Sequence, residues 1–130
     1  MVIESSTFER NKAKINDGGA VFIHEDSVLG VSSSVFRDCT AKRYGGALVV
    51  RGAQQSIAVV EATLFESNAA TDTFPYGFGG ALSIRHSAEV TLAGGGNTFK
   101  ENNARQGASI SMTDPPTKLL FDGCSPGTYR

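Results

Sequence analysis

Carboxylates are the side chains of this sequence best suited to chemistry, because clustered carboxylic acids on one face can cleave glycosidic bonds. The six aspartates are irregularly spaced and comprise Asp17, Asp26, Asp38, Asp72, Asp114 and Asp122. The two histidines, His24 and His86, are not both accompanied by Cys or carboxylate at metal-ligand spacing. Neither a Gly-x-Ser-x-Gly nucleophile turn nor a phosphate-binding Gly-x-x-x-x-Gly-Lys occurs. We therefore predict no metal and no cofactor, and the aspartates must be judged from the elements that carry them.

Composition narrows those elements to strands. The chain has 130 residues, with 15 Gly, 8 Phe and no Trp, and no window has a helical apolar stripe. Twelve Lys and Arg against 13 Asp and Glu give a net charge of -1, which argues against a nucleic-acid partner. Apolar runs such as 47–50 are far too short to cross a bilayer, so we expect no membrane insertion by this segment. The composition predicts an all-β protein.

A glycine motif repeats along the chain. Its copies begin 27, 34 and 28 residues apart, at Gly18-Gly19, Gly45-Gly46, Gly79-Gly80 and the diverged Gly107-Ala108. Each is followed by alternating apolar residues, and the longer interval indicates a loop inserted around 71–78. We expect the glycines to permit the turn into a strand.

A phenylalanine motif lies between the glycine motifs. Its copies begin at Phe8, Phe36, Phe65, Phe99 and Phe121. The residue three positions later is Asn11, Cys39, Asn68, Asn102 or Cys124. A third β-like stretch recurs at 28–31, 57–60 and 90–92. Each repeat therefore predicts three short strands.

Three strands per repeat predict a right-handed parallel β-helix of about 4–5 coils over residues 1–121. Equivalent positions would stack from coil to coil. One internal column would be Val21, Leu48, Leu82 and Ile110, and a second Ile23, Val50, Ile84 and Met112. The five phenylalanines would form an aromatic stack. Asn11, Asn68 and Asn102 would form a turn ladder in which Asn tolerates a left-handed backbone.

The same register decides the functional expectations. The aspartates fall at different repeat positions, so stacking should not gather them, and we predict that the protein is not an enzyme. The residues after each phenylalanine alternate in sign and predict an exposed ladder of weak ion pairs, formed by Glu9, Arg37, Glu66, Lys100 and Asp122. The column of His24, Arg51 and Arg85 would either meet an anionic glycan or form a solvated turn.

An apolar surface is the best candidate for partner binding. We expect Phe22 and Val49 at the outward position of the glycine strands, with Phe74 and Tyr76 from the inserted loop beside them. The alternative, that this loop packs against its own solenoid, stays open.

The two interleaved motifs resemble the repeat of the chlamydial polymorphic outer-membrane proteins, autotransporter adhesins with β-helical passenger domains. The match runs from Phe8 to Met112 and is relaxed at Cys39 and Ala108. The chain's last residues, 122–130, resemble the start of an ephrin-receptor-like cysteine-rich extracellular module through Cys124-Ser125-Pro126-Gly127-Thr128-Tyr129.

These resemblances imply an extracellular or cell-surface protein, in the outer membrane if bacterial, whose export signal and further repeats lie in a longer parent chain. Its role would be adhesion, display or the spacing of other modules. Its partner would be a cell-surface protein or a glycan of a host. The alternative is a fragment of a carbohydrate-active, pectin lyase-like enzyme. Cleavage of a pectin-like polymer would favour that alternative.

The cysteines are predicted not to bond to each other. Cys39 and Cys124 would lie three coils apart, about 14 Å at roughly 4.8 Å per coil, whereas a disulfide needs Cα atoms within about 7 Å. Cys39 should be a buried small apolar residue in the turn ladder.

Overall fold

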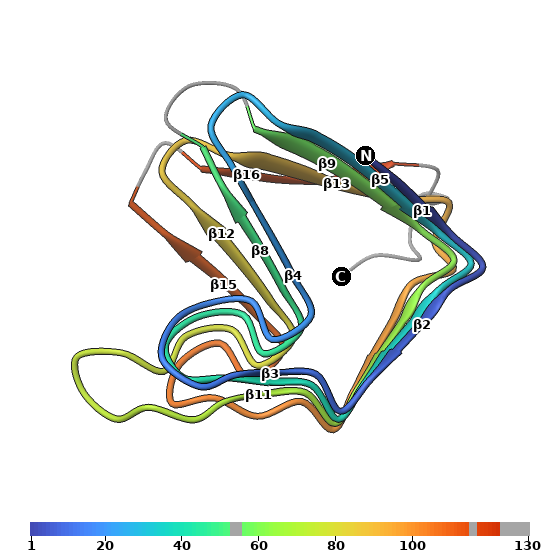
Figure 1. The fold of residues 1–130 in the computed structure, drawn as a ribbon. Coiled ribbons are helices and arrows are strands. Elements are labelled where there is room, and N and C mark those ends of the chain that lie inside the picture. Colours follow the sequence, from blue (N-terminus) through green and yellow to red (C-terminus); the bar gives the residue numbers. More distant parts are fainter. Residues whose placement is uncertain (53–55, 115–116, 123–130) are drawn as a thin grey trace.

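The chain forms a parallel β-solenoid of about four turns in the computed structural model, which describes residues 1–52, 56–114 and 117–122. Figure 1 looks along the solenoid, where the successive coils lie almost on top of one another. Every strand pair in it is parallel, and each strand pairs with its equivalent in the next coil. The predicted all-β solenoid is confirmed.

Four sheets run along the solenoid. The first sheet contains β1 (Val2–Glu4), β5 (Val28–Ser32), β9 (Ile57–Glu61), β13 (Glu89–Ala93) and β16 (Lys118–Asp122). The second contains β2 (Thr7–Glu9), β6 (Val35–Arg37), β10 (Leu64–Glu66) and β14 (Thr98–Lys100). The third contains β3 (Lys12–Ala13), β7 (Thr40–Ala41) and β11 (Ala69–Ala70). The fourth contains β4 (Val21–His24), β8 (Leu48–Arg51), β12 (Leu82–Arg85) and β15 (Ile110–Thr113).

The third sheet was not expected, because each coil was predicted to have three strands. Its strands are only two residues long and follow the Asn or Cys of the phenylalanine motif. So short a run carries no alternation that a sequence pattern could reveal. Ala41 and Ala70 on these strands are buried, so this corner also contributes to the core.

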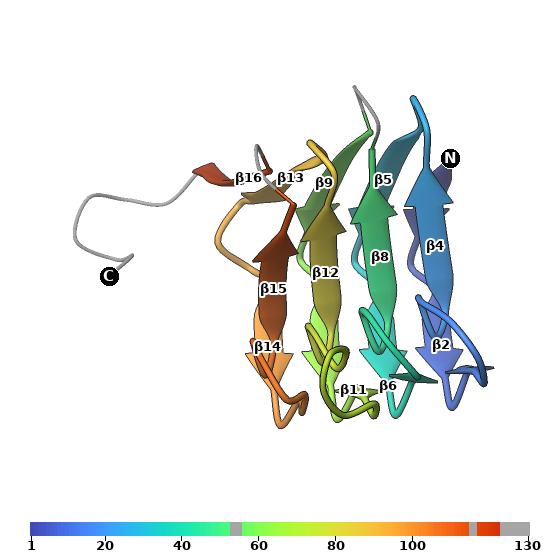
Figure 2. The same cartoon turned by 90° about the vertical axis from the view of Figure 1, so that its left-hand side faces the viewer.

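The predicted register of the glycine strands is confirmed. Leu48 pairs with Val21 and Leu82, and Leu82 pairs with Ile110. The second column pairs in the same way and comprises Ile23, Val50, Ile84 and Met112. Figure 2 shows the four strands of this sheet side by side. Leu48, Leu82 and Ile84 are fully buried, whereas Met112 in the last coil is 45% exposed.

The two glycines of each pair serve different purposes. The first has a positive φ, +58° at Gly45 and +69° at Gly79, which glycine adopts without a Cβ penalty. The second has no positive φ, but a Cβ at Gly46 would collide with the backbone oxygen of Gly80 in the next coil. The second glycine is therefore required by the close approach of stacked backbones.

The left-handed residue of the asparagine turn is not the asparagine. The residue before it has the positive φ, as at Arg10 (57°), Asp38 (53°), Ser67 (56°) and Glu101 (55°). The expectation for Asn11, Asn68 and Asn102 was therefore wrong by one position. This turn directs the next side chain inward, so the asparagine is held by its hydrogen bonds instead.

Phe121 does not extend the phenylalanine stack, so that prediction is wrong. It lies on β16, where it pairs with Leu92 of the first sheet, and it is 59% exposed. Asp122 pairs with Ala93 and so does not continue the charge ladder. In each coil the strand after the fourth-sheet strand belongs to the first sheet, and β16 occupies that place, so Phe121 does not stand at the start of a phenylalanine motif. Of the proposed cysteine-rich module at 122–130, Asp122 lies on β16, and Cys124 with the rest of the module lies outside the described residues.

The secondary structure assigned over the described ranges consists of strands and turns, and no helix there could span a membrane.

Candidate functional site

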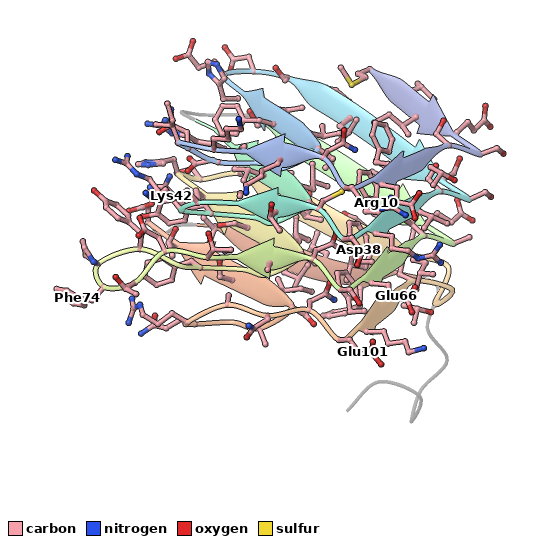
Figure 3. All side chains as sticks on the ribbon, turned by 60° about the horizontal axis from the view of Figure 1, so that its bottom comes forward. Arg10, Asp38, Lys42, Glu66, Phe74 and Glu101 are labelled. Carbon is pink, nitrogen blue, oxygen red and sulfur yellow. The ribbon has the colours of Figure 1, made fainter. Side chains whose placement is uncertain are left out.

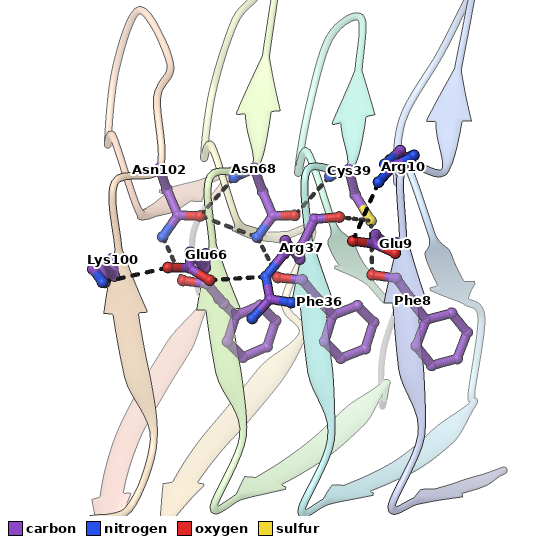
Figure 4. Close-up of polar contacts among 11 residues, drawn as sticks. Phe8, Glu9, Arg10, Phe36, Arg37, Cys39, Glu66, Asn68, Lys100 and Asn102 are labelled. Atoms are coloured by element: carbon purple, nitrogen blue, oxygen red, sulfur yellow. Dashed lines mark hydrogen bonds and ion pairs between the residues drawn. The ribbon is translucent and has the colours of Figure 1, made fainter.

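The phenylalanines of the second sheet form a column of rings that packs in the hydrophobic core. Adjacent rings of Phe8, Phe36, Phe65 and Phe99 stack with centroids 4.8, 5.0 and 4.8 Å apart and planes within 5°. Figure 4 shows Phe8 and Phe36 in this arrangement. Phe36 and Phe65 are fully buried. The four-ring stack is as predicted, and its role is structural.

A ladder of buried amides runs beside the rings. Asn68 donates from Nδ2 to the Phe36 carbonyl oxygen (2.9 Å) and to Asn102 Oδ1 (3.1 Å). Its own Oδ1 accepts a hydrogen bond from the Cys39 N–H (3.0 Å). Asn102 repeats the pattern, because its Nδ2 donates to the Phe65 carbonyl oxygen (3.0 Å). Each side chain thus ties its coil to its neighbours, as predicted (Figure 4).

Cys39 occupies the same ladder as a buried thiol, as predicted. Its Sγ lies 3.4 Å from the carbonyl oxygen of Phe8, and the more weakly held Asn11 Nδ2 is 3.9 Å from that sulfur. Burial raises the pKa of the Cys39 thiol. In the described part of the chain Cys39 is a free cysteine.

The charged column on the outside of the second sheet forms ion pairs in three of its four coils. Arg37 Nε donates to Glu66 Oε2 at 2.9 Å, and Lys100 Nζ lies 3.4 Å from Glu66 Oε1. Hydrogen bonds from Arg37 and Lys100 lower the pKa of the Glu66 carboxyl. Glu9 instead contacts Arg10 of its own coil at 3.8 Å. These ion pairs join the coils of Arg37, Glu66 and Lys100.

The outer face of the fourth sheet is covered over β8 and β12, contrary to the prediction for Val49. Val49 and its neighbour Ser83 are fully buried, although both point away from the core. Three segments between the third and fourth sheets, which we call the fold-back segments, cover these side chains and span 14–20, 42–47 and 71–81. Within them Tyr44 stacks on Phe78, with ring centroids 5.4 Å apart. Val49 is therefore no part of an exposed partner surface. The inserted loop does pack against its own solenoid, through Phe78 and Tyr76.

This cover leaves a hollow, which we call the arginine cleft. It has a volume of about 580 Å³ and is open to solvent on one side. Its lining comes from three fourth-sheet strands and from the three fold-back segments, and comprises Asn16, Asp17, Phe22, Arg43, Tyr44, Arg51, Tyr76 and Arg85. The volume is in the range of small-molecule sites.

Arg85 is the anchored cation of the cleft. Its guanidinium lies 3.7 Å from the Tyr44 ring centroid and contacts Asp17 Oδ2 (3.5 Å) and Asp114 Oδ2 (3.3 Å). His86 Nε2 is also 3.4 Å from that Asp114 oxygen. The expectation that stacking keeps the aspartates apart is therefore wrong for Asp17 and Asp114. They come from a fold-back segment and from a strand end, and both reach the same arginine.

Asp17 is the less exposed acid of this cluster, with 13% of its side chain accessible against 42% for Asp114. Burial raises the pKa of its carboxyl, and the nearby Arg85, Arg43 and Arg51 oppose that rise. Its Oδ1 has no hydrogen-bond partner within the described residues. Oδ2 faces Arg85, so one guanidinium holds the carboxylate.

Arg43 and Arg51 are the cations of the cleft that the described residues leave without an ion pair. The Arg43 guanidinium lies 4.4 Å from the Tyr76 ring centroid. Arg51 is exposed and pairs in register with His24 and Arg85, which confirms the predicted column. His24 contacts Glu25 at 3.7 Å and lines a smaller hollow of about 160 Å³ that it shares with Arg51.

The remaining partner-surface residues separate into two places. Phe22, 38% exposed, and the half-buried Tyr76 both line the arginine cleft. Phe74 is 81% exposed on the loop that protrudes beyond the other coils in Figure 1, and its side chain points away from the solenoid in Figure 3.

Sequence reasoning missed half of the cleft. Asn16, Asp17, Arg43 and Tyr44 lie on fold-back segments, where no alternation marks the inward face. One signal was available: Asp17, Tyr44, Phe78 and Gln106 each immediately precede a glycine motif. Isolated parallel bridges join Tyr44 to Phe78 and Phe78 to Gln106, so these positions stack like strands.

Comparison with protein-family models, with curated proteins and with solved structures gives no match for this chain. Within the described ranges, no group of three or more His, Cys, Asp or Glu side chains is arranged to hold a metal ion.

Proposed function

We propose that this chain is a non-catalytic binding or display module of a secreted or cell-surface protein, used for adhesion. The motif resemblance to the polymorphic outer-membrane protein repeat supports this proposal, as does the solenoid it predicted. The proposal extends to an extracellular location, and to further repeats and a cysteine-rich module in a longer chain.

The observation that carries the proposal is the arginine cleft. Arg43 and Arg51 enter into no ion pair in the described residues, while Phe22 and Tyr76 line the same hollow. Guanidinium groups that lack an ion-pair partner and lie beside aromatic rings favour recognition of a partner group. The cleft lies on stacked strands, which hold its lining in fixed positions.

The test is binding of the whole chain to arrayed glycans and to cell-surface glycoproteins. We expect retention that Arg51→Gln weakens and that Arg10→Gln leaves unchanged. Arg10 is a matched control, because its side chain is 79% exposed and it lies on the second-sheet side of the coil, away from the cleft. Retention that is the same for both variants, or no retention by any ligand, would contradict the proposal.

A second candidate function is a carbohydrate-active enzyme of the pectin lyase-like kind. The specific observation in its favour is the Asp17–Arg85–Asp114 cluster, because two carboxylates beside an arginine can act on an acidic polymer. We expect no cleavage of polygalacturonate by the chain. Cleavage that is abolished in Asp17→Asn would establish the enzyme instead.

A further inference from the structure

We infer that the arginine cleft binds an acidic saccharide, with Arg43 and Arg51 on its anionic group and Phe22 and Tyr76 against its ring. This inference rests on the proposed binding function and names the ligand class. These four residues belong neither to the hydrophobic core nor to the charge ladder of the second sheet.

Charge selects an anion. Three guanidinium groups line the cleft, and the nearest carboxylates, Asp17 and Asp114, both contact Arg85. Arg43 and Arg51 remain available, and a planar guanidinium donates two parallel hydrogen bonds to a carboxylate or sulfate group. A neutral ligand would leave these donors without a charged acceptor.

The rings select a saccharide among anions. Phe22 is 38% exposed although it lies on a strand, and Tyr76 faces the same hollow beneath Arg43. Aromatic rings at the wall of a polar cleft suit the apolar face of a sugar ring, and the amide of Asn16 in the same lining can hydrogen-bond a sugar hydroxyl group. Inorganic phosphate would use the arginines and leave the exposed part of Phe22 in contact with water.

The position of the cleft disfavours a peptide. A peptide strand binds most simply at an open sheet edge, where its backbone completes a ladder. The cleft lies on the face of the fourth sheet, and β8 and β12 there already pair on both sides. The wall residues are mostly polar, so the cleft also lacks the deep apolar pocket that anchors a peptide side chain.

The experiment is calorimetric titration of the full chain with trigalacturonate and a heparin-derived tetrasaccharide, against maltotriose as the neutral probe. We expect at least one acidic probe to bind about tenfold or more tightly than maltotriose, and Arg51→Gln to weaken it by about tenfold. Phe22→Ala should weaken it while leaving the salt dependence of binding unchanged, because it removes a ring and no charge. Arg10→Gln should bind as the wild type does.

Three outcomes would overturn the inference: equal affinity for acidic and neutral probes, equal losses of affinity in Arg51→Gln and Arg10→Gln, or tighter binding of oligoglutamate than of either acidic sugar.

The results distinguish a failure of this inference from a failure of the proposed binding function. Retention of a neutral glycan or a glycoprotein on the array, without acidic-sugar binding, removes the inference and leaves the binding module. Binding of trigalacturonate followed by its cleavage keeps the inference and removes the non-catalytic function. If the variants unfold at the same urea concentration as the wild type, their loss of affinity does not come from unfolding.

Discussion

The Asn68 side chain hydrogen-bonds the coils on both sides of its own. It is fully buried and hydrogen-bonds Phe36, Cys39 and Asn102. We expect Asn68→Ala to lower the free energy of unfolding by at least about 2 kcal/mol, because it leaves buried polar partners unsatisfied. Urea denaturation followed by circular dichroism measures this loss.

Asn11 provides the control at the same repeat position. It is half-buried, and its side chain reaches only a sulfur at 3.9 Å. Asn11→Ala should therefore cost less than about 1 kcal/mol. Equal losses in the two variants would mean that the asparagines act through turn geometry rather than through their hydrogen bonds.

Glu66 makes the stability depend on pH. Its pKa is lowered from the ordinary 4.5 by Arg37 and Lys100, so the unfolded chain binds this proton more readily than the folded chain. Its contribution is present above pH 4.5 and is lost as the pH falls through the folded pKa. We expect the urea midpoint of Glu66→Gln to lie below that of the wild type at pH 7, and the gap to narrow as the solution is acidified below pH 4.5.

The exposed Glu4 of β1, which takes no part in the ladder, serves as the control for that titration. Glu4→Gln should track the wild type across the same pH range. A gap for Glu66→Gln that persists unchanged in acid would show that its effect does not come from the ion pairs.

At the scale of the element, the second glycine of each pair sets how closely coils approach. Gly46→Ala should destabilise the protein by about 3 kcal/mol or more, because the new Cβ would meet the backbone of the next coil. Gly30→Ala in β5 is the matched control, since its Cβ would have open space. That variant should be neutral or about 0.4–1 kcal/mol more stable. Thermal and urea unfolding of both would decide, and a folded, stable Gly46→Ala would contradict the observed spacing.

The strands were predictable where a residue type recurs at a fixed interval. Leu48 and Leu82 follow equivalent glycines, so their stacking could be predicted from the sequence alone. Phe121 shows the limit, because a tetrapeptide match assigned it to the second sheet although the preceding Leu119-Leu120 already continue a first-sheet strand. Val49 shows a second limit of prediction. An apolar residue at an outward position can belong to an exposed patch, or another segment of the chain can cover it. Only the path of the fold-back segments distinguishes the two.

The candidate site was predictable to a similar degree. Arg51 and Arg85 were found because they recur in register with His24. Asp17 and Tyr44 were not, because they approach that column through segments that follow neither a strand nor a helix period. Whether Arg85 is solvated or enclosed depends on those segments as well, and its side chain proves to be only 13% exposed.

At the scale of the molecule, each strand pairs with its equivalents in adjacent coils, so stability should be distributed along the solenoid. In the fourth sheet β8 and β12 are paired on both sides, whereas β4 and β15 are each paired on one side in the described residues. We expect backbone amides of β8 and β12 to exchange with deuterium more slowly than those of β4 and β15. Mass-spectrometric exchange of peptides from each strand tests this, and uniform protection across the four strands would indicate a single all-or-none unit.

The alternating charges of the second sheet bear on how the chain avoids errors while it folds. Successive coils resemble one another, so a coil that loops out would let its two neighbours stack directly, with the phenylalanines still matched. Skipping the coil of Arg37 would place Glu9 against Glu66, and skipping the coil of Glu66 would place Arg37 against Lys100. Like charges in direct cross-strand register repel. The ladder therefore penalises stacks that omit a coil, and it gives nearly interchangeable turns a fixed order.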